Sequence, residues 1–106
     1  MLRRGDCYFV LPNGPMSKGY PAVIVSAGEL GNLRRINMVQ LSLFPRSLSD
    51  TDVVVEVTGT PSVARCEVVQ SIKPETLGDF VGCCTEEEMR DIGAAVAHGL
   101  GLKNYG

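Results

Sequence analysis

The sequence contains few of the side chains from which common catalytic centres are built. It has a single histidine, His98, and no tryptophan, and aromatic residues make up 6% of the chain. No segment matches the glycine-rich loops that bind nucleotide phosphates or the H-E-x-x-H motif of zinc hydrolases. These absences argue against metal-dependent hydrolysis and against nucleophilic catalysis by histidine. They leave metal-free chemistry or binding, and we expect no cofactor.

Long apolar segments are also missing. No stretch reaches the roughly 18 consecutive apolar residues of a membrane-spanning helix. The N-terminal apolar run is short and interrupted by Asp6, which is unlike a signal peptide. With 106 residues, of which 44% are hydrophobic, the chain suits one domain, residues 1–106, with an ordinary core. We expect a cytoplasmic protein that does not associate with membranes.

The four cysteines, Cys7, Cys66, Cys83 and Cys84, do not form a recognisable metal-binding pattern. None of their spacings is C-x-x-C, and two adjacent cysteines offer poor geometry for one metal ion. The only histidine lies far along the chain from the first two. We therefore predict reduced, structural cysteines and no metal site.

Charge is distributed unevenly along the chain. Residues 1–49 carry six basic and two acidic side chains, a net charge of +4, whereas residues 50–106 carry four basic and ten acidic ones, a net charge of −6. A basic segment suits a polyanionic partner such as RNA. Because halves of a sequence need not form faces of a fold, the asymmetry only suggests such a partner.

The remaining pattern indicates several short strands followed by one helix. Segments rich in β-branched residues alternate with Gly, Pro and Asn turns, and we predict strands at 6–11, 20–26, 37–43, 52–58, 62–72 and 79–83. The continuous apolar run at 22–25 predicts a strand that is buried on both faces. In the strand at 62–72, alternation places Ala64, Cys66 and Val68 on one face and Arg65, Glu67 and Val69 on the other.

A C-terminal helix is predicted to begin at Thr85. Thr85 and Glu88 have the spacing of a capping box, and Gly99 and Gly101 are expected to end the helix. An apolar stripe at helical spacing should pack on the sheet; it consists of Met89, Ile92, Val96 and Leu100. Strands followed by a terminal helix predict a mainly β protein, a small antiparallel barrel with a C-terminal helix attached.

Arg65, Glu67, Ser42 and Lys18 are the candidate functional residues. On one face of a strand, Arg65 and Glu67 would form an acid–base pair able to cleave RNA without a metal ion. Glu67 would accept the proton of a ribose 2′-hydroxyl, and Arg65 would stabilise charge on the phosphoryl oxygens. Ser42 and Lys18 are candidates for phosphate contacts. The alternatives are an exposed ion pair of little energetic value, a serine that bonds the backbone, and an ordinary loop lysine.

The order of several segments resembles a known family. The segments are RRGDCYFV, GYPAVIVS, Asn32, the strand ending at Leu41-Ser42, PSVARCEVVQSI, and LGDFVGCCTEEEMRDIGAAVAHGLGL, which together span residues 3–102. They resemble the MazF/PemK (Kid-like) toxins of type II toxin–antitoxin systems. The resemblance implies an SH3-like barrel with a C-terminal helix, usually as a homodimer. It also implies a metal-independent endoribonuclease that cleaves single-stranded RNA at short sequences and is neutralised by a cognate antitoxin.

The resemblance carries over to individual positions unevenly. Arg65-Cys66-Glu67 matches an Arg-Cys-Asp element of the Kid-like branch with a longer acid, and Ser42 stands where a threonine is usual. Tyr20 occupies the position, just before the proline, at which many members have an arginine. A tyrosine can stack on a base but supplies no positive charge. We expect Ser17, Lys18 and Tyr20 to contact RNA, with Lys18 replacing the missing charge or the activity being weakened.

Three functions follow as hypotheses. The first is an endoribonuclease toxin in which Arg65, Glu67 and Ser42 are catalytic. The second is a family member that has lost cleavage and retains binding of RNA or of an antitoxin, which the tyrosine at position 20 favours. The third is a CcdB-like toxin that binds gyrase, against which the Arg65-Cys66-Glu67 element counts.

Overall fold

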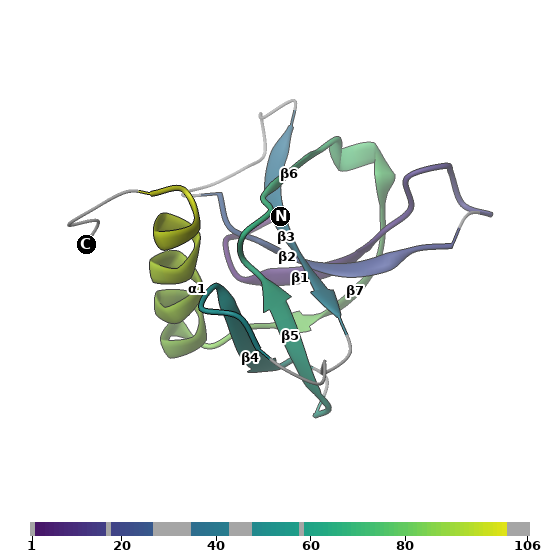
Figure 1. The fold of residues 1–106 in the computed structure, drawn as a ribbon. Helices are drawn as coiled ribbons and strands as arrows, with labels where there is room; N and C mark the ends of the chain where they lie inside the picture. The colour runs from purple at the N-terminus through teal and green to yellow at the C-terminus, as the bar shows by residue number, and fades with distance from the viewer. Residues whose placement is uncertain (1, 17, 27–34, 43–47, 58, 102–106) are drawn as a thin grey trace.

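Seven short strands and one C-terminal helix make up the part of the chain that the computed structural model describes, which is residues 2–16, 18–26, 35–42, 48–57 and 59–101 (Figure 1). The strands are β1 Asp6–Val10, β2 Tyr20–Ile24, β3 Ile36–Ser42, β4 Asp52–Glu56, β5 Pro61–Arg65, β6 Gln70–Ile72 and β7 Leu77–Cys83. A 3-10 turn, η1 Pro74–Thr76, precedes β7, and the helix is α1 Glu86–Gly99. The predicted class, mainly antiparallel β with a C-terminal helix, is confirmed.

The strands form one antiparallel sheet in the order β4-β5-β3-β2-β1-β7. β3 is central, because β2 pairs with one of its edges while β5 and β6 pair in succession with the other. Leu41 of β3 lies opposite Ala64 of β5, and Met38 lies opposite Gln70 of β6. The chain therefore has to turn between β5 and β6 beside the middle of β3.

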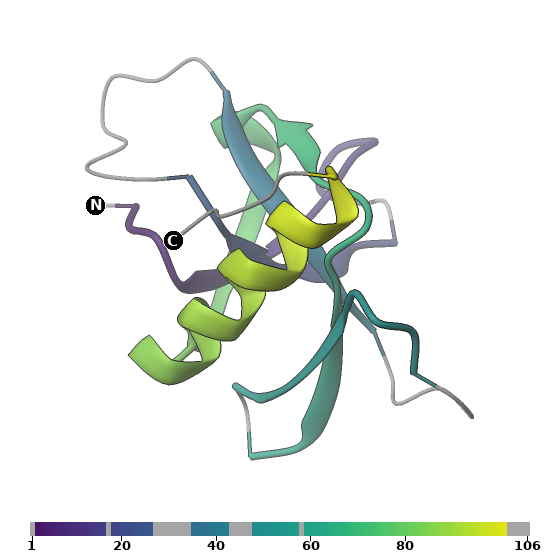
Figure 2. The same ribbon diagram turned by 60° about the vertical axis from the view of Figure 1, so that its left-hand side comes forward.

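The two ends of this strand order approach each other. A β-carbon added at Gly82 of β7 would lie 2.8 Å from both the Cγ1 atom and the carbonyl oxygen of Val57, the residue that follows β4. Only a residue without a side chain allows the two chain segments to come this close. The sheet consequently curls into a small barrel, and α1 packs across it at one side (Figure 2).

Apolar side chains fill two core clusters on the two faces of the curled sheet. One lies beneath α1 and includes Met89 and Ile92 of the helix, and the other includes Ile36 and Met38 of β3. β2 contributes Val23 to the first cluster and Ala22 and Ile24 to the second, and all three side chains are fully buried. Burial of this strand on both faces, predicted from its continuous apolar run, is confirmed.

The helix begins as its sequence predicts. Thr85 Oγ1 accepts a hydrogen bond from the N–H of Glu88 at 3.1 Å, and Glu88 Oε1 accepts one from the N–H of Thr85 at 2.8 Å. Glu88 Oε2 also accepts a hydrogen bond from the N–H of Glu56 at the end of β4. One carboxylate thus caps the helix and joins it to the sheet.

The C-terminal part of the helix differs from the prediction. Leu100 is 62% exposed, because the helix ends at Gly99 and Leu100 does not continue its apolar stripe, whereas Ala95 and Ala97 of the helix are buried. Gly101 has a φ of +73°, as expected of a helix-ending glycine. Gly99 is the last residue of the helix and does not end it by a left-handed turn. It packs closely, because a β-carbon there would lie 3.3 Å from the Cα of Glu67. Within the described ranges, no helix has the length and apolarity needed to cross a membrane.

The predicted long strand at 62–72 is wrong. β5 ends at Arg65, Cys66 and Glu67 form a turn closed by a hydrogen bond from the N–H of Val68 to the carbonyl of Arg65, and β6 begins at Gln70. The alternation of faces is lost at this turn, since Val68 is 55% exposed while Val69 packs against the core. The sequence pattern predicts one strand because the segment is rich in β-branched residues and contains no glycine or proline.

Candidate functional site

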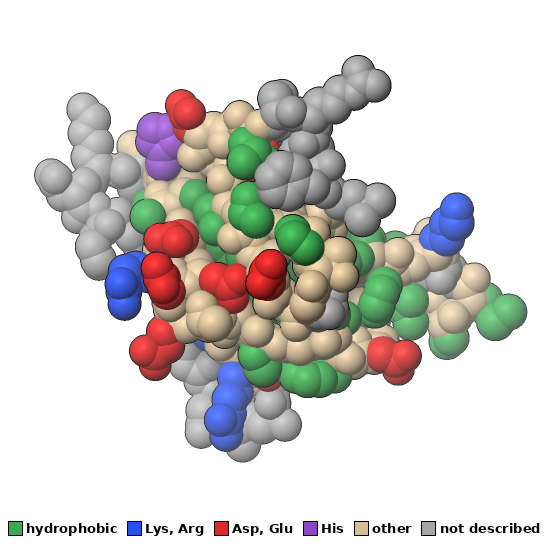
Figure 3. Space-filling model, turned by 90° about the horizontal axis from the view of Figure 1, so that it is seen from below, with side chains coloured by type: hydrophobic (Ala, Val, Ile, Leu, Met, Phe, Trp, Pro, Cys, Tyr) green, Lys and Arg blue, Asp and Glu red, His purple; other side chains and the backbone are tan. Residues whose placement is uncertain are grey.

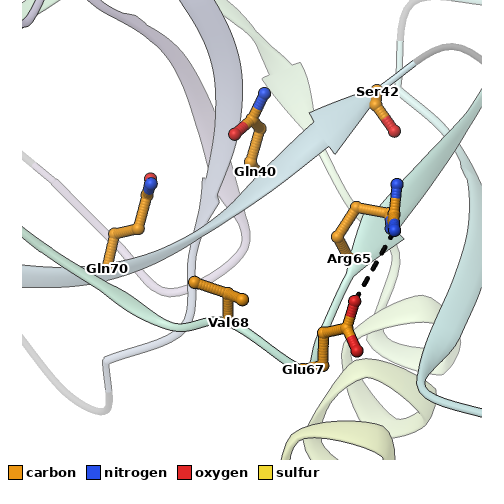
Figure 4. A pocket seen from close by; sticks show the side chains of 6 residues that line it. All are labelled: Gln40, Ser42, Arg65, Glu67, Val68 and Gln70. Carbon is orange, nitrogen blue, oxygen red and sulfur yellow. Dashed lines mark ion pairs between the residues drawn. The ribbon is translucent and has the colours of Figure 1, made fainter.

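A surface pocket of about 230 Å³ opens over the turn between β5 and β6 (Figure 4). Side chains from β3, from the end of β5, from the turn and from β6 line it: Gln40, Ser42, Arg65, Glu67, Val68 and Gln70. Gln40 and Ser42 are two residues apart on β3 and therefore share a face, with the buried Leu41 between them pointing into the core. The pocket lies beside β3, between the part of its edge that pairs with β5 and the part that pairs with β6.

Arg65 forms ion pairs with two carboxylates. Its Nε atom lies 3.1 Å from Oδ1 of Asp52, and its Nη2 atom lies 3.5 Å from Oε1 of Glu67. The Asp52 side chain is only 3% exposed, whereas that of Arg65 is 44% exposed, so water still screens this ion pair from the side of the arginine. The contact is not well aligned as a hydrogen bond. A second carboxylate oxygen of Asp52 accepts a hydrogen bond from the N–H of Ser49, which holds the carboxylate in place.

Glu67 is adjacent to Arg65 for a reason other than the predicted one. It lies in the turn after β5, and the turn rather than strand alternation brings its carboxylate to the guanidinium (Figure 4). Both side chains are about half exposed, and an ion pair of this kind contributes about 0–1 kcal/mol. The ion pair therefore holds Glu67 against Arg65 only weakly. Cys66, between them, is 1% exposed and sits in the core as predicted.

Ser42 contributes a hydroxyl group to the pocket. Its Oγ atom is buried and makes no hydrogen bond to any residue that the structure describes. An unsatisfied buried hydroxyl costs about 1–3 kcal/mol, and such groups in native proteins call for an explanation. The Ser42 hydroxyl therefore lies at the pocket without a partner among the described residues.

Tyr20 does not line the pocket but contacts a residue that does. At the start of β2, its hydroxyl donates a hydrogen bond to Oε1 of Gln70 at 2.8 Å. Burial raises the pKa of Tyr20, although the hydrogen bond to Gln70 acts in the opposite direction, so the hydroxyl remains a proton donor at neutral pH. Because Tyr20 occupies the Oε1 acceptor, Gln70 keeps its two N–H donors for other partners.

Two other loop residues, Ser17 and Lys18, were proposed as RNA contacts. Lys18 is exposed and is absent from the residues that line the pocket. Ser17 lies outside the described residues, as does Asn32. The segment between β1 and β2 projects from the barrel on the side away from α1 (Figure 1).

Sequence reasoning missed Asp52, Gln40 and Gln70. A signal for Asp52 was present in the spacing of the two strands around Gly59. Glu56 lies opposite Pro61 in the β4–β5 hairpin, and the same antiparallel register places Asp52 opposite Arg65. A signal for Gln40 was also present, because it lies two residues before Ser42 in the predicted strand at 37–43 and therefore shares its face. No comparable signal marked Gln70, because its position depends on the turn between β5 and β6.

The distribution of charge in space is less simple than the division of the sequence. Several acidic side chains gather on the face of the molecule seen from below, whereas the basic ones are scattered (Figure 3). The N-terminal end of α1 points to that side in Figure 1, and its first turn carries Glu86, Glu87 and Glu88. Such a surface repels a polyanion. Among the described residues, no group of three or more His, Cys, Asp or Glu side chains is placed to hold a metal ion.

The chain is thus a small antiparallel β-barrel protein with a C-terminal helix, and Arg65, Glu67 and Ser42 lie at one of its surface pockets. Residues 3–100 match the family model described as PemK-like, MazF-like toxin of type II toxin–antitoxin system. The chain belongs to this family of toxins. No curated protein matches the chain significantly.

Solved structures agree with the family. An endoribonuclease from a mycobacterial species is 25% identical, with a TM-score of 0.79, and the match covers 96% of this chain and 93% of that one. A mycobacterial endoribonuclease in complex with its cognate antitoxin gives the same identity and TM-score and covers 96% of this chain and 97% of that one. A MazE–MazF structure from Deinococcus radiodurans has a TM-score of 0.79 at 12% identity, covering 96% and 97%. The last similarity concerns the fold alone.

Proposed function

We propose that this chain is a toxin that cleaves single-stranded RNA at the pocket formed by Arg65, Glu67 and Ser42. The observation that carries the proposal is the meeting of three groups at one pocket on a family barrel: a guanidinium, a carboxylate, and a hydroxyl that has no partner among the described residues. Two mycobacterial structures of the same fold at 25% identity are named endoribonucleases. Their activity supports the same reaction class for this chain.

The chemistry requires a base and a group that stabilises charge on phosphorus. Glu67 accepts the proton of a ribose 2′-hydroxyl, and the resulting oxygen attacks the adjacent phosphorus. Arg65 stabilises the negative charge that develops on the phosphoryl oxygens, and Ser42 donates its hydroxyl hydrogen to one of them. The bond to the 5′-oxygen breaks, and the departing oxygen takes a proton from water, to which Glu67 returns the proton that it accepted. The products are a 2′,3′-cyclic phosphate on one fragment and a 5′-hydroxyl on the other.

The partners of the proposed toxin follow from its relatives. One solved relative is bound to its cognate antitoxin, and we propose that this chain likewise binds an antitoxin protein. We also propose that it forms a homodimer in the cytoplasm, where its RNA substrate is found. Pairing of two barrels would cover exposed strand edges, which otherwise invite aggregation.

The test is cleavage of a long single-stranded RNA by the purified protein in the presence of a chelator. Arg65→Ala and Glu67→Ala are the test variants, and Glu87→Gln, on the exposed first turn of α1, is the control. We expect discrete fragments from the wild-type protein and from Glu87→Gln, and at least a hundredfold slower cleavage by the other two variants, about 2.7 kcal/mol in activation free energy. Equal cleavage by all four proteins would overturn the assignment of the pocket.

A second candidate function is binding without cleavage. Tyr20 stands where the family often has an arginine, and neither Tyr20 nor Lys18 lines the pocket. The same RNA in a gel-shift assay separates the two functions. RNA that the wild-type protein binds and leaves intact would favour the binding protein and reject the ribonuclease.

A further inference from the structure

Two of the four cysteines lie side by side at the junction of β1, β7 and α1. The Sγ atoms of Cys7 and Cys84 are 3.9 Å apart. Sheet register explains the contact: Cys7 lies opposite Gly82 in the antiparallel β1–β7 pair, and Cys84, two residues further on, shares its face. The N–H of Cys84 donates a hydrogen bond to the carbonyl of Gly5, which holds the two segments together.

The neighbouring Cys83 points the other way. It is exposed, and its thiol donates a hydrogen bond to Oδ1 of Asp6 at 3.4 Å. Cys66 is buried, and its thiol donates to the carbonyl of Ala64. Of the four thiols, which all lie in the described part of the chain, only Cys7 and Cys84 contact each other.

Access and reactivity differ within the Cys7–Cys84 pair. Cys7 is fully buried, whereas Cys84 is half-buried, so a small reagent reaches Cys84 first. The side-chain contact with the Cys7 sulfur lowers the pKa of Cys84, against the opposing effects of burial and of Glu88. Burial and the hydrogen bond to Asp6 instead raise the pKa of Cys83. Thiolates are the reactive form in disulfide exchange.

We propose that Cys7 and Cys84 form a dithiol modification site that reacts with small-molecule disulfides to give an internal disulfide. The Cys84 thiolate attacks one sulfur of the reagent RS–SR, forming a mixed disulfide and releasing RS⁻. The sulfur of Cys7 then attacks the Cys84 sulfur, which forms the Cys7–Cys84 bond and releases the second RS group, which takes the Cys7 proton. Two protein thiols are oxidised, and one reagent disulfide is reduced to two thiols.

Formation of the bond requires the two sulfurs to approach each other. The sulfurs have to close from 3.9 Å to about 2.05 Å. Cys84 is suited to move, because it lies one residue beyond the end of β7 and before the first residue of α1. The bond would tie β1 to the start of the helix across most of the chain, and long loops closed by a disulfide restrict the unfolded state strongly.

The experiment treats the reduced full-length protein with oxidised glutathione, followed by denaturation, alkylation of free thiols, trypsin digestion and mass spectrometry. We expect the wild type to yield peptides 5–18 and 66–90 joined by one disulfide, with a loss of two hydrogen atoms that dithiothreitol reverses. Because peptide 66–90 contains three cysteines, variants locate the bond. Cys83→Ser and Cys66→Ser should retain the link, and Cys84→Ser should lose it.

Thermal unfolding provides a second measurement. The oxidised wild type and the oxidised Cys83→Ser variant should both melt several degrees above their reduced forms, and Cys84→Ser should show no shift. A link that persists in Cys84→Ser, a bond between Cys83 and Cys84, or a wild type left with four alkylated thiols would each overturn the proposal. None of these readouts depends on RNA cleavage.

Discussion

The carboxylate of Asp52 and the guanidinium of Arg65 face each other across the β4–β5 hairpin, 3.1 Å apart between Oδ1 and Nε. Asp52 is almost fully buried and Arg65 is half exposed, so the buried partner fixes one side of the guanidinium while the other side faces the pocket. Asp52 is therefore a positioning residue for Arg65, and it owes that role to the register of the hairpin.

Asp52→Asn should weaken the hold on Arg65 while keeping an oxygen that can accept from the N–H of Ser49. An ion pair with one exposed partner is worth roughly 1 kcal/mol, so we expect kcat for RNA cleavage to fall by about fivefold, with KM changed less. Single-turnover kinetics measure the effect. The control is Asp50→Asn, at an exposed position two residues before Asp52, which should behave as the wild type. An Asp52→Asn variant with unchanged kcat would contradict the positioning role.

Ser42→Ala should separate stability from activity. The Oγ atom is buried without a partner in the described part of the chain, so its removal should raise the free energy of unfolding by roughly 1 kcal/mol or leave it unchanged. Loss of the hydroxyl should nevertheless slow cleavage by about tenfold, since one donor to a phosphoryl oxygen is removed.

Urea denaturation and cleavage kinetics measure these two effects, with Ser42→Thr as the variant that keeps the hydroxyl. A Ser42→Ala protein that is destabilised by more than about 1 kcal/mol would show that the hydroxyl has a structural partner.

The sequence was sufficient for most elements of the fold and for part of the site. Local signals specified the helix start at Thr85 and Glu88 and the doubly buried β2, because capping and continuous apolar runs act over a few residues. Arg65 and Glu67 were identified as neighbours, but from a strand that does not exist at Glu67. The turn at Cys66 and Glu67 arises from the pairing of β5 and β6 with one edge of β3, and this tertiary constraint leaves no local mark.

The hydrogen bond of Tyr20 likewise depends on tertiary structure that the local sequence does not indicate. Its place before Pro21 indicated a loop contact with RNA, whereas the structure joins its hydroxyl to Gln70, which is fifty residues away in the chain. No property of either residue in the sequence predicts that partner. It follows that Tyr20 influences the pocket through Gln70.

Tyr20→Phe removes only the hydroxyl and should free the Gln70 amide to rotate. We expect KM for RNA to rise by about threefold to tenfold, which corresponds to one hydrogen bond of roughly 1 kcal/mol, with kcat nearly unchanged. Gln70→Ala should give an effect of similar size, and the double variant should be no worse than either single one. Additive losses in the double variant would indicate that Tyr20 and Gln70 act independently.

Tyr20→Arg restores the side chain that many members of the family have at this position. A permanent positive charge at the margin of the pocket should stabilise developing negative charge, and we expect faster cleavage by about tenfold in spite of the lost contact with Gln70. Tyr20→Gln, which is uncharged, is the matched control. An arginine variant no faster than the glutamine variant would show that charge at this position does not reach the reacting phosphate.

Glu88→Ala should destabilise the protein more than Thr85→Ala. The Glu88 side chain accepts two backbone hydrogen bonds, whereas the Thr85 side chain accepts one. Thr85→Ala removes the hydrogen bond to the N–H of Glu88 and should cost about 1 kcal/mol. Glu88→Ala removes the acceptor for the N–H of Thr85 and the acceptor for the N–H of Glu56, and should cost about 2 kcal/mol. Urea denaturation of both variants measures the difference, with Glu87→Ala as the control on the same turn. Equal losses for the two variants would mean that the contact between Glu88 and β4 adds nothing to the stability of the helix on the sheet.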